Sequence, residues 1–145
     1  MLTHDSFQYI GCSHHFFNDL VLNYKPNQPL LAFPPLYPII LSIGYFFNNP
    51  MKGFEFLHII IFAINSILVV KFFTKHVNNN LIQIGAISFT ILSSFFIVNH
   101  VFIWSEAFFY TLSFLWFNQT LKIQKNQSFK NSIIYILIGL LLCMQ

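Results

Sequence analysis

Residues 54–73 read FEFLHIIIFAINSILVVKFF, and this run decides the fold. Its two charged residues, Glu55 and Lys71, lie near its ends, and almost every residue between them is apolar. A helix rises ~1.5 Å per residue, so about 20 residues span the ~30 Å hydrocarbon core of a bilayer. The run therefore predicts a helix that crosses a membrane.

The composition of the whole chain favours the same interpretation. Of its 145 residues, 56% are hydrophobic and 8% are charged, whereas about 25% of the residues in a soluble domain are charged. We therefore predict an all-α integral membrane protein. Its seven basic residues are all lysines. They are scattered rather than gathered in a basic patch, which argues against a nucleic-acid partner.

Three more apolar runs follow the first span, so that about four transmembrane helices are expected. Residues 81–98 predict the second span, and residues 101–121 predict the third, with Glu106 in its first two turns. The fourth, 132–145, is incomplete, because its apolar part would form a helix of only ~20 Å. A chain that stops inside the bilayer is expected to be a fragment.

The residues before the first span, 1–53, are predicted to form an external loop with juxtamembrane helices, and 54–145 the transmembrane region. Three prolines interrupt 30–47, and proline removes a backbone donor and disfavours helix in the residue before it. The proline-free part, 39–47, would form ~14 Å of helix, too short to cross. We expect an extended entry and a membrane-skirting helix at 39–47, with a second short interfacial helix around 7–22.

The lysines predict the orientation of the spans. The loops after the first and third spans are rich in lysine, and the loop between the second and third has none. Lysine-rich loops face the cytoplasm, which gives a multi-pass protein of the cytoplasmic (inner) membrane. If 30–47 does not cross, Asp5 lies outside with Glu106. If it does cross, the two acids lie on opposite sides and cannot share a site.

Three short motifs interrupt the apolar sequence in a recognisable order. They are Asp5-Ser6-Phe7-Gln8-Tyr9, then Pro34-Pro35-Leu36-Tyr37-Pro38, then Ser105-Glu106. The chain resembles the N-terminal part of the GT-C membrane glycosyltransferases, in particular the ArnT-like, protein-mannosyltransferase-like group. The resemblance implies a polyprenyl-phosphate-linked sugar donor and a lipid, glycan or protein acceptor. It also implies transfer on the periplasmic or extracellular face of the membrane.

The chain departs from that family in three respects. Family members have a membrane helix before the aspartate loop, and many have His where this chain has Phe33. No Arg is present to hold a phosphate, so Lys25 or Lys52 would have to serve as a point charge. Family members also continue through several more spans, so the 145-residue chain alone is expected to be inactive because it holds too little of the active cavity.

The resemblance also implies roles for particular residues. Asp5 would be the base that takes the acceptor's proton, and Glu106 would face the donor site through a divalent metal or the acceptor. The residues expected to bind the donor, besides the two lysines, are Tyr9, Pro34, Pro35 and Tyr37. Simpler alternatives are helix-terminal acids favoured by the macrodipole and a proline kink in an ordinary membrane protein. No cofactor or metal site is predicted from the His and Cys pattern.

A second hypothesis is a small non-enzymatic polytopic membrane protein, either a transporter subunit or an assembly factor. It predicts no dependence on Asp5 or Glu106. A transporter should place polar residues along one face in mid-membrane, and the candidates there, such as Asn65 and Ser66, are only mildly polar. The transferase hypothesis also predicts that an impermeant thiol reagent reaches Cys12 from outside.

Overall fold

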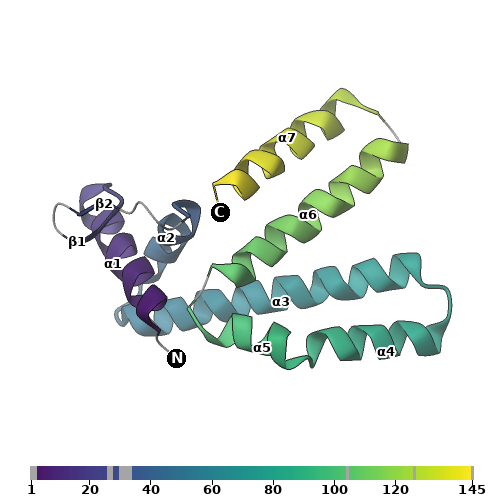
Figure 1. The fold of residues 1–145 in the computed structure, drawn as a ribbon, viewed down its shortest axis with the longest axis horizontal. Helices are drawn as coiled ribbons and strands as arrows, with labels where there is room; N and C mark the ends of the chain where they lie inside the picture. The colour runs from purple at the N-terminus through teal and green to yellow at the C-terminus, as the bar shows by residue number, and fades with distance from the viewer. Residues whose placement is uncertain (1–2, 26–27, 30–33, 104, 126, 145) are drawn as a thin grey trace.

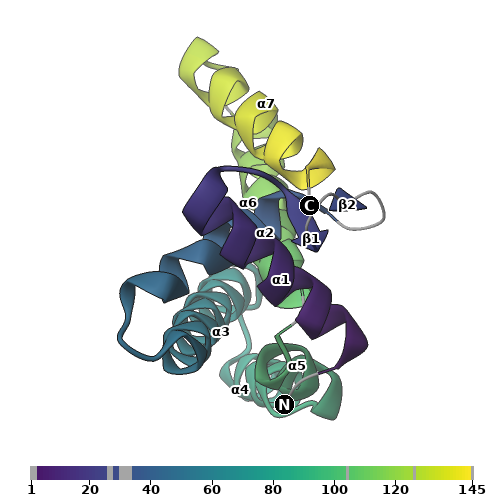
Figure 2. The same ribbon diagram turned by 90° about the vertical axis from the view of Figure 1, so that its left-hand side faces the viewer.

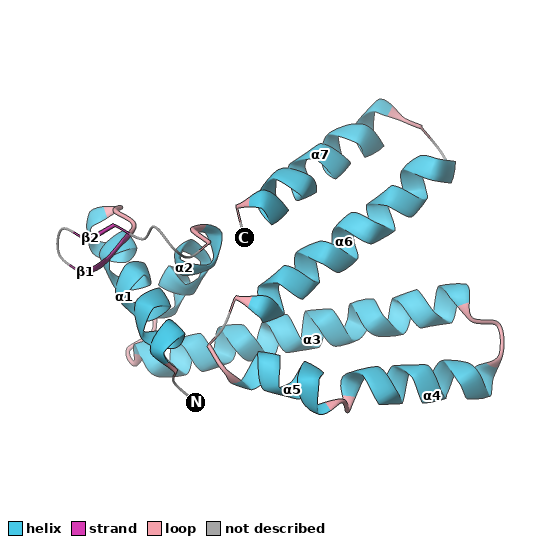
Figure 3. Ribbon diagram, viewed as in Figure 1, coloured by secondary structure: helices cyan, strands magenta, loops and turns pink. Residues whose placement is uncertain are grey.

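The computed structural model describes residues 3–25, 28–29, 34–103, 105–125 and 127–144. These residues form seven α-helices, one 3-10 helix (η1) and a small antiparallel ribbon, so the chain is all-α in class (Figure 3). The elements in chain order are α1 (His4–Asp19), β1 (Asn23–Lys25), β2 (Gln28–Pro29), α2 (Leu36–Leu41), η1 (Ser42–Phe46), α3 (Pro50–His76), α4 (Asn80–Ile91), α5 (Ser94–Val101), α6 (Glu106–Lys125) and α7 (Phe129–Cys143).

The first predicted span is a single helix, α3, somewhat longer than the apolar run itself. The Asn49 side chain caps it by accepting hydrogen bonds from the backbone N–H groups of Met51 and Lys52. Pro50 occupies the first turn, where its missing N–H costs nothing. The apolar window of α3 has a mean hydropathy of 2.2, and 22% of it is buried. The helix is therefore long and apolar enough to cross a membrane, and most of its apolar surface is uncovered.

The second predicted span, 81–98, is not one straight helix. It is divided into α4 and α5, whose axes differ by 42°. Ser93 is in extended conformation at the break, and its hydroxyl accepts a hydrogen bond from the Phe96 N–H. This cap starts a new helix, because serine satisfies one of the free N–H groups of a first turn. Taken together, α4 and α5 are long and apolar enough to form one broken span.

The last two predicted spans differ from their expected form. The run 101–121 is divided between the end of α5 and α6, which begins only at Glu106. α6 has 20 residues, but Asn118, Gln119 and Lys122 make its second half polar. α7 has 15 residues, about 22 Å of helix, which is shorter than a hydrocarbon core. Within the described residues, one helix could span a membrane, or two if the bent pair counts as one.

The membrane-skirting helix predicted at 39–47 starts earlier than expected. α2 begins at Leu36 and continues as the 3-10 helix η1 to Phe46. Pro38 is in the first turn of α2, where no intrahelical N–H bond is lost, so proline does not delay the helix. Of the predicted extended entry, 30–33 lie outside the described residues. The helix expected around 7–22 is present as α1, shifted towards the N-terminus, and its interfacial position stays a prediction.

Figure 1 shows two helical hairpins, α3 with α4–α5 and α6 with α7, which diverge from a shared end. α1, α2 and the ribbon cover that end, and Figure 2 shows α1 and α2 in front of α3 and α6. The hydrophobic core also lies there and consists of Tyr9, Tyr37, Leu41, Phe54 and Ile103. The turn after α3 and the turn between α6 and α7 both lie away from that end, and Figure 1 shows them well apart because the two hairpins diverge.

Candidate functional site

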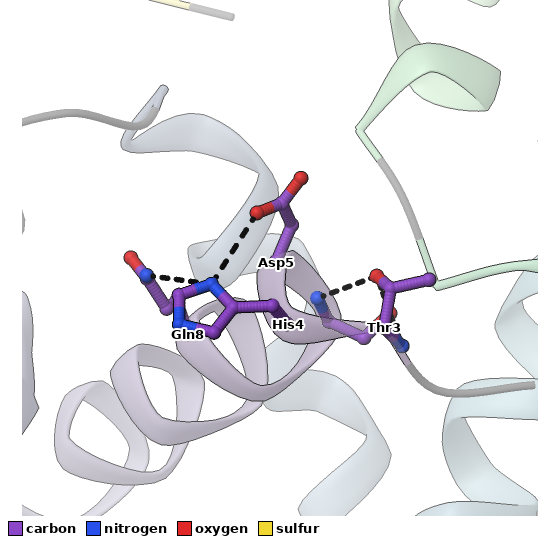
Figure 4. A network of polar contacts seen from close by, with 5 residues as sticks. Thr3, His4, Asp5 and Gln8 are labelled. Carbon is purple, nitrogen blue, oxygen red and sulfur yellow. Dashed lines mark hydrogen bonds and ion pairs between the residues drawn. The ribbon is translucent and has the colours of Figure 1, made fainter.

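Asp5 lies in the first turn of α1, and Figure 4 shows its surroundings. The helix starts with a capping box, in which the Thr3 side chain accepts from the Ser6 N–H and the Ser6 side chain accepts from the Thr3 N–H. The Asp5 carboxylate is half exposed and lies 3.7 Å from Nδ1 of His4. Nε2 of Gln8 lies 3.3 Å from the same ring nitrogen. An accessible carboxylate is thus fixed at a helix N-terminus, where the macrodipole favours its charge.

Tyr9, one turn after Asp5, connects α1 to the start of α6. Its buried hydroxyl donates a hydrogen bond to Oγ of Ser105 over 3.0 Å. Burial raises the pKa of Tyr9, and the Ser105 hydrogen bond partly opposes this shift. The carboxylates of Glu106 and Asp5 raise the pKa of Tyr9 further. Both acids therefore act on the same tyrosine, although one is in α1 and the other is in α6.

Tyr37, from the proline motif, packs edge-on against Tyr9 with the ring centroids 4.9 Å apart. Only 1% of its surface is exposed, so it belongs to the framework of the site and does not line an open entrance. Its hydroxyl donates to Nε2 of His58 over 2.6 Å. Burial holds the pKa of Tyr37 well above its usual value, and Tyr9 and Glu106 add to that rise.

His58 begins a buried polar network that connects α3, α5 and α6. Its Nδ1–H donates to the backbone carbonyl of His100 over 3.3 Å. The Asn65 amide donates to Nε2 of His100 and to the carbonyl of Ala107, each over 2.8 Å. Oδ1 of Asn65 accepts the hydroxyl of Thr111 at 2.9 Å. Both N–H groups and the oxygen of the Asn65 amide are thus hydrogen-bonded. Each histidine is neutral and carries its proton on Nδ1, which faces a backbone carbonyl.

This network was not predicted, although the sequence carries one signal for it. His58 and Asn65 are seven residues apart in an otherwise apolar helix, which is about two turns and places them on one face. Polar side chains in such a helix face the protein interior. The sequence did not identify the partners His100 and Thr111. Their positions depend on the break between α4 and α5, which decides where the following helices lie.

The remaining residues expected to bind the donor are spread around the same end. Lys25 belongs to β1, which packs against α1, and its side chain is exposed. Lys52 is exposed in the first turn of α3. Pro34 and Pro35 are half-buried immediately before α2, and Pro35 is its N-cap residue. The proline segment thus leads directly into the helix that carries Tyr37, and both lysines are exposed to solvent.

Two further expectations concern metal and cysteine. Among the described residues, no three His, Cys, Asp or Glu side chains gather as a metal ion would require. The divalent metal implied by the resemblance stays a prediction. Cys12 is completely buried, and burial raises its pKa to about 11. A thiol reagent in solution will not reach it in the folded protein, so the expected labelling of Cys12 is corrected.

The arrangement provides two accessible carboxylates, Asp5 and Glu106, beside a buried and hydrogen-bonded tyrosine pair. A carboxylate in such a position can take a proton from a hydroxyl group. Three comparisons with known proteins, against family models, curated proteins and solved structures, give no match. The function is therefore argued from the residues and the geometry of this end of the molecule.

Proposed function

We propose that this chain is part of a GT-C membrane glycosyltransferase. The enzyme would transfer one sugar from a polyprenyl-phosphate carrier to a lipid, glycan or protein acceptor on the outer face of the cytoplasmic membrane. The observation that supports this most is the convergence of three separated motifs. Tyr37 packs against Tyr9, the Tyr9 hydroxyl is bonded to Ser105, and the charges of Asp5 and Glu106 both act on the pKa of Tyr9.

The arrangement of the helices is consistent with the membrane orientation in this proposal. The acids lie at the end of the molecule covered by α1 and α2, and the last turns of α3 and α6 carry Lys75 and Lys125 away from that end (Figure 1). Lysines in the last turns of both helices agree with the positive-inside rule, which counts basic residues and gives acids little weight. In this proposal α3, the bent pair α4–α5, α6 and α7 would be the four membrane helices.

In the proposed reaction, an acceptor hydroxyl oxygen bonds to the anomeric carbon while the bond from that carbon to the carrier phosphate breaks. Asp5 takes the hydroxyl proton, which raises the nucleophilicity of the oxygen as the bond forms. The carrier leaves with the phosphate's negative charge. Lys25 or Lys52 would balance this charge, and Glu106 would orient the acceptor. Tyr9 and Tyr37 would hold α1 and α2 in place.

The test is the Asp5→Asn variant in membranes that contain the full-length protein. We expect transfer from a radiolabelled polyprenyl-phosphate sugar to fall at least about a hundredfold, because a general base typically contributes 10²–10⁴-fold. Asp19→Asn is the matched control, since Asp19 is an exposed acid at the other end of α1. Normal transfer by Asp5→Asn, with equal amounts of protein in the membrane, would remove Asp5 from the mechanism.

The buried network supports a second candidate, a non-enzymatic membrane protein such as a transporter subunit. Asn65, His100 and Thr111 place polar groups inside the helical region rather than at its surface, as a transport path would. Every nitrogen and oxygen of these side chains is already bonded within the protein, so the network provides no free ligand for a substrate. For this reason the transferase is the stronger candidate.

A further inference from the structure

A groove between α3 and α5 shares His58 and His100 with the buried polar network described above. Its volume is about 570 Å³, and it is lined by Glu55, His58, Ile59, Phe62, Ile97, His100 and Val101. The two helices are in contact along this groove, through the His58–His100 hydrogen bond and the ring of Phe62 against His100. Four of the seven lining residues are apolar, so the groove suits a hydrocarbon chain.

Glu55 is the one charged group in the lining and also the one polar side chain free to bind. The ring nitrogens of His58 are bonded to Tyr37 and to the His100 carbonyl. Those of His100 are bonded to Asn65 and to the Phe96 carbonyl. No described residue donates a hydrogen bond or an ion pair to the Glu55 carboxylate. An occupant therefore meets one anion, two imidazole rings whose nitrogens are already bonded, and otherwise hydrocarbon.

The groove also has a direction. Glu55 lies in the second turn of α3, and Phe62 lies seven residues later, about 10 Å deeper along the helix. Because α3 begins at the end covered by α1 and α2 (Figure 1), Glu55 would be at the outer membrane interface and Phe62 within the hydrocarbon. A ligand that matches this pattern has a cationic head group and an apolar chain.

We propose that the groove binds a lipid with a primary ammonium head group, with phosphatidylethanolamine as the matching chemistry. The ammonium donates hydrogen bonds to the Glu55 carboxylate, and an acyl chain lies along Ile59, Phe62 and Ile97. This inference rests on the membrane placement of α3 and is independent of the transferase activity. Ile59 is 64% exposed, so an acyl chain along the groove has apolar surface to cover.

The experiment is native mass spectrometry of the purified protein in a non-ionic detergent. Phosphatidylethanolamine, phosphatidylcholine and phosphatidylglycerol are compared with identical acyl chains. We expect phosphatidylethanolamine to be retained about threefold more than phosphatidylcholine, which has the same charge but no N–H donor, as for a partly exposed ion pair. Phosphatidylglycerol, which has no cation, should be retained least.

Three variants separate the contributions. Glu55→Gln should abolish the preference for phosphatidylethanolamine, and Asp19→Asn, which removes an acid elsewhere on the surface, should keep it. Val101→Trp, which fills the outer part of the groove, should reduce retention of all three lipids. Equal retention of the lipids by the unmodified protein, an unchanged preference in Glu55→Gln, or a dimer that excludes lipid would overturn the proposal. Recovery of the protein from the soluble fraction would instead refute the membrane placement itself.

Discussion

Asn65 shows how much one buried side chain can organise in this molecule. Its amide joins three helices, because it is bonded to His100 on α5 and to Ala107 and Thr111 on α6. The side chain is completely buried, so water cannot replace a lost partner. In the proposed membrane placement, a hydrogen bond between helices contributes about 0.6 kcal/mol on average, and three bonds together are significant for a small protein.

We predict that Asn65→Ala lowers the free energy of unfolding by about 2 kcal/mol. The measurement is unfolding by sodium dodecyl sulfate in mixed micelles, monitored by circular dichroism. Asn118→Ala is the matched control and should change stability by only a few tenths of a kcal/mol, because its amide bonds the Phe114 carbonyl of its own helix. Equal effects of the two substitutions would show that the network does not hold the helices together.

At the scale of elements, the contact between η1 and α3 depends on two glycines. A Cβ added to Gly53 would fall on the carbonyl oxygen of Gly44 and 2.9 Å from its Cα. A Cβ added to Gly44 would meet the ring of Phe54, which belongs to the core. Because the Gly53 contact is with backbone, no side-chain rotation can relieve it. The close approach lets α2 and η1 lie on the first turns of α3.

Gly53→Ala is therefore expected to destabilise the protein by about 1–3 kcal/mol, as overpacking in a core does. Gly85→Ala is expected to have the opposite effect on stability. Gly85 is in the middle of α4 with no atom within 4 Å of its added Cβ, so alanine should stabilise by about 1 kcal/mol through helix propensity. Thermal unfolding in detergent compares the two variants. The packing account fails if both substitutions move the melting temperature in the same direction.

For the whole molecule, the proposal makes a testable statement about which end faces the cytoplasm. The proposed orientation places α1 outside and the C-terminal end of α3 inside. Cys12 cannot report this, because it is buried with a raised pKa, and the reactive species of cysteine is the thiolate. Introduced cysteines at exposed positions are needed instead. Asn18 on α1 and Lys75 on α3 are both exposed and lie at opposite ends.

In a Cys143→Ser background, which removes the exposed native thiol, we expect an impermeant maleimide to label Asn18→Cys in intact cells. Lys75→Cys should be labelled only after the membrane is permeabilised. Labelling is read as the increase in the protein's apparent mass on a gel. Labelling of both positions from the same side would place the acids and the lysines on one face of the membrane and would contradict the proposed topology.

Local chemistry was sufficient to predict several elements of this fold. The run 54–73 identified α3, because an apolar run of that length with charges only near its ends has few alternatives to a long helix. Helix was also expected near α1, at 39–47 and within 101–121. The break inside 81–98 was missed because the Ser93 cap starts a new helix there. The start of α2 was missed because Pro38 falls in its first turn, where proline is tolerated.

Composition and the length of apolar runs thus determined by themselves that the chain is helical and has at least one helix fit for a membrane. Only the tertiary structure decided which polar residues meet. Tyr9 reaches Ser105 across 96 positions of sequence, and Asn65 reaches Thr111 across 46. Such pairs depend on the angle of the α4–α5 break and on the approach of Gly53 to Gly44. Sequence spacing carries no information on this angle or this approach, because it describes only which residues are neighbours along one helix.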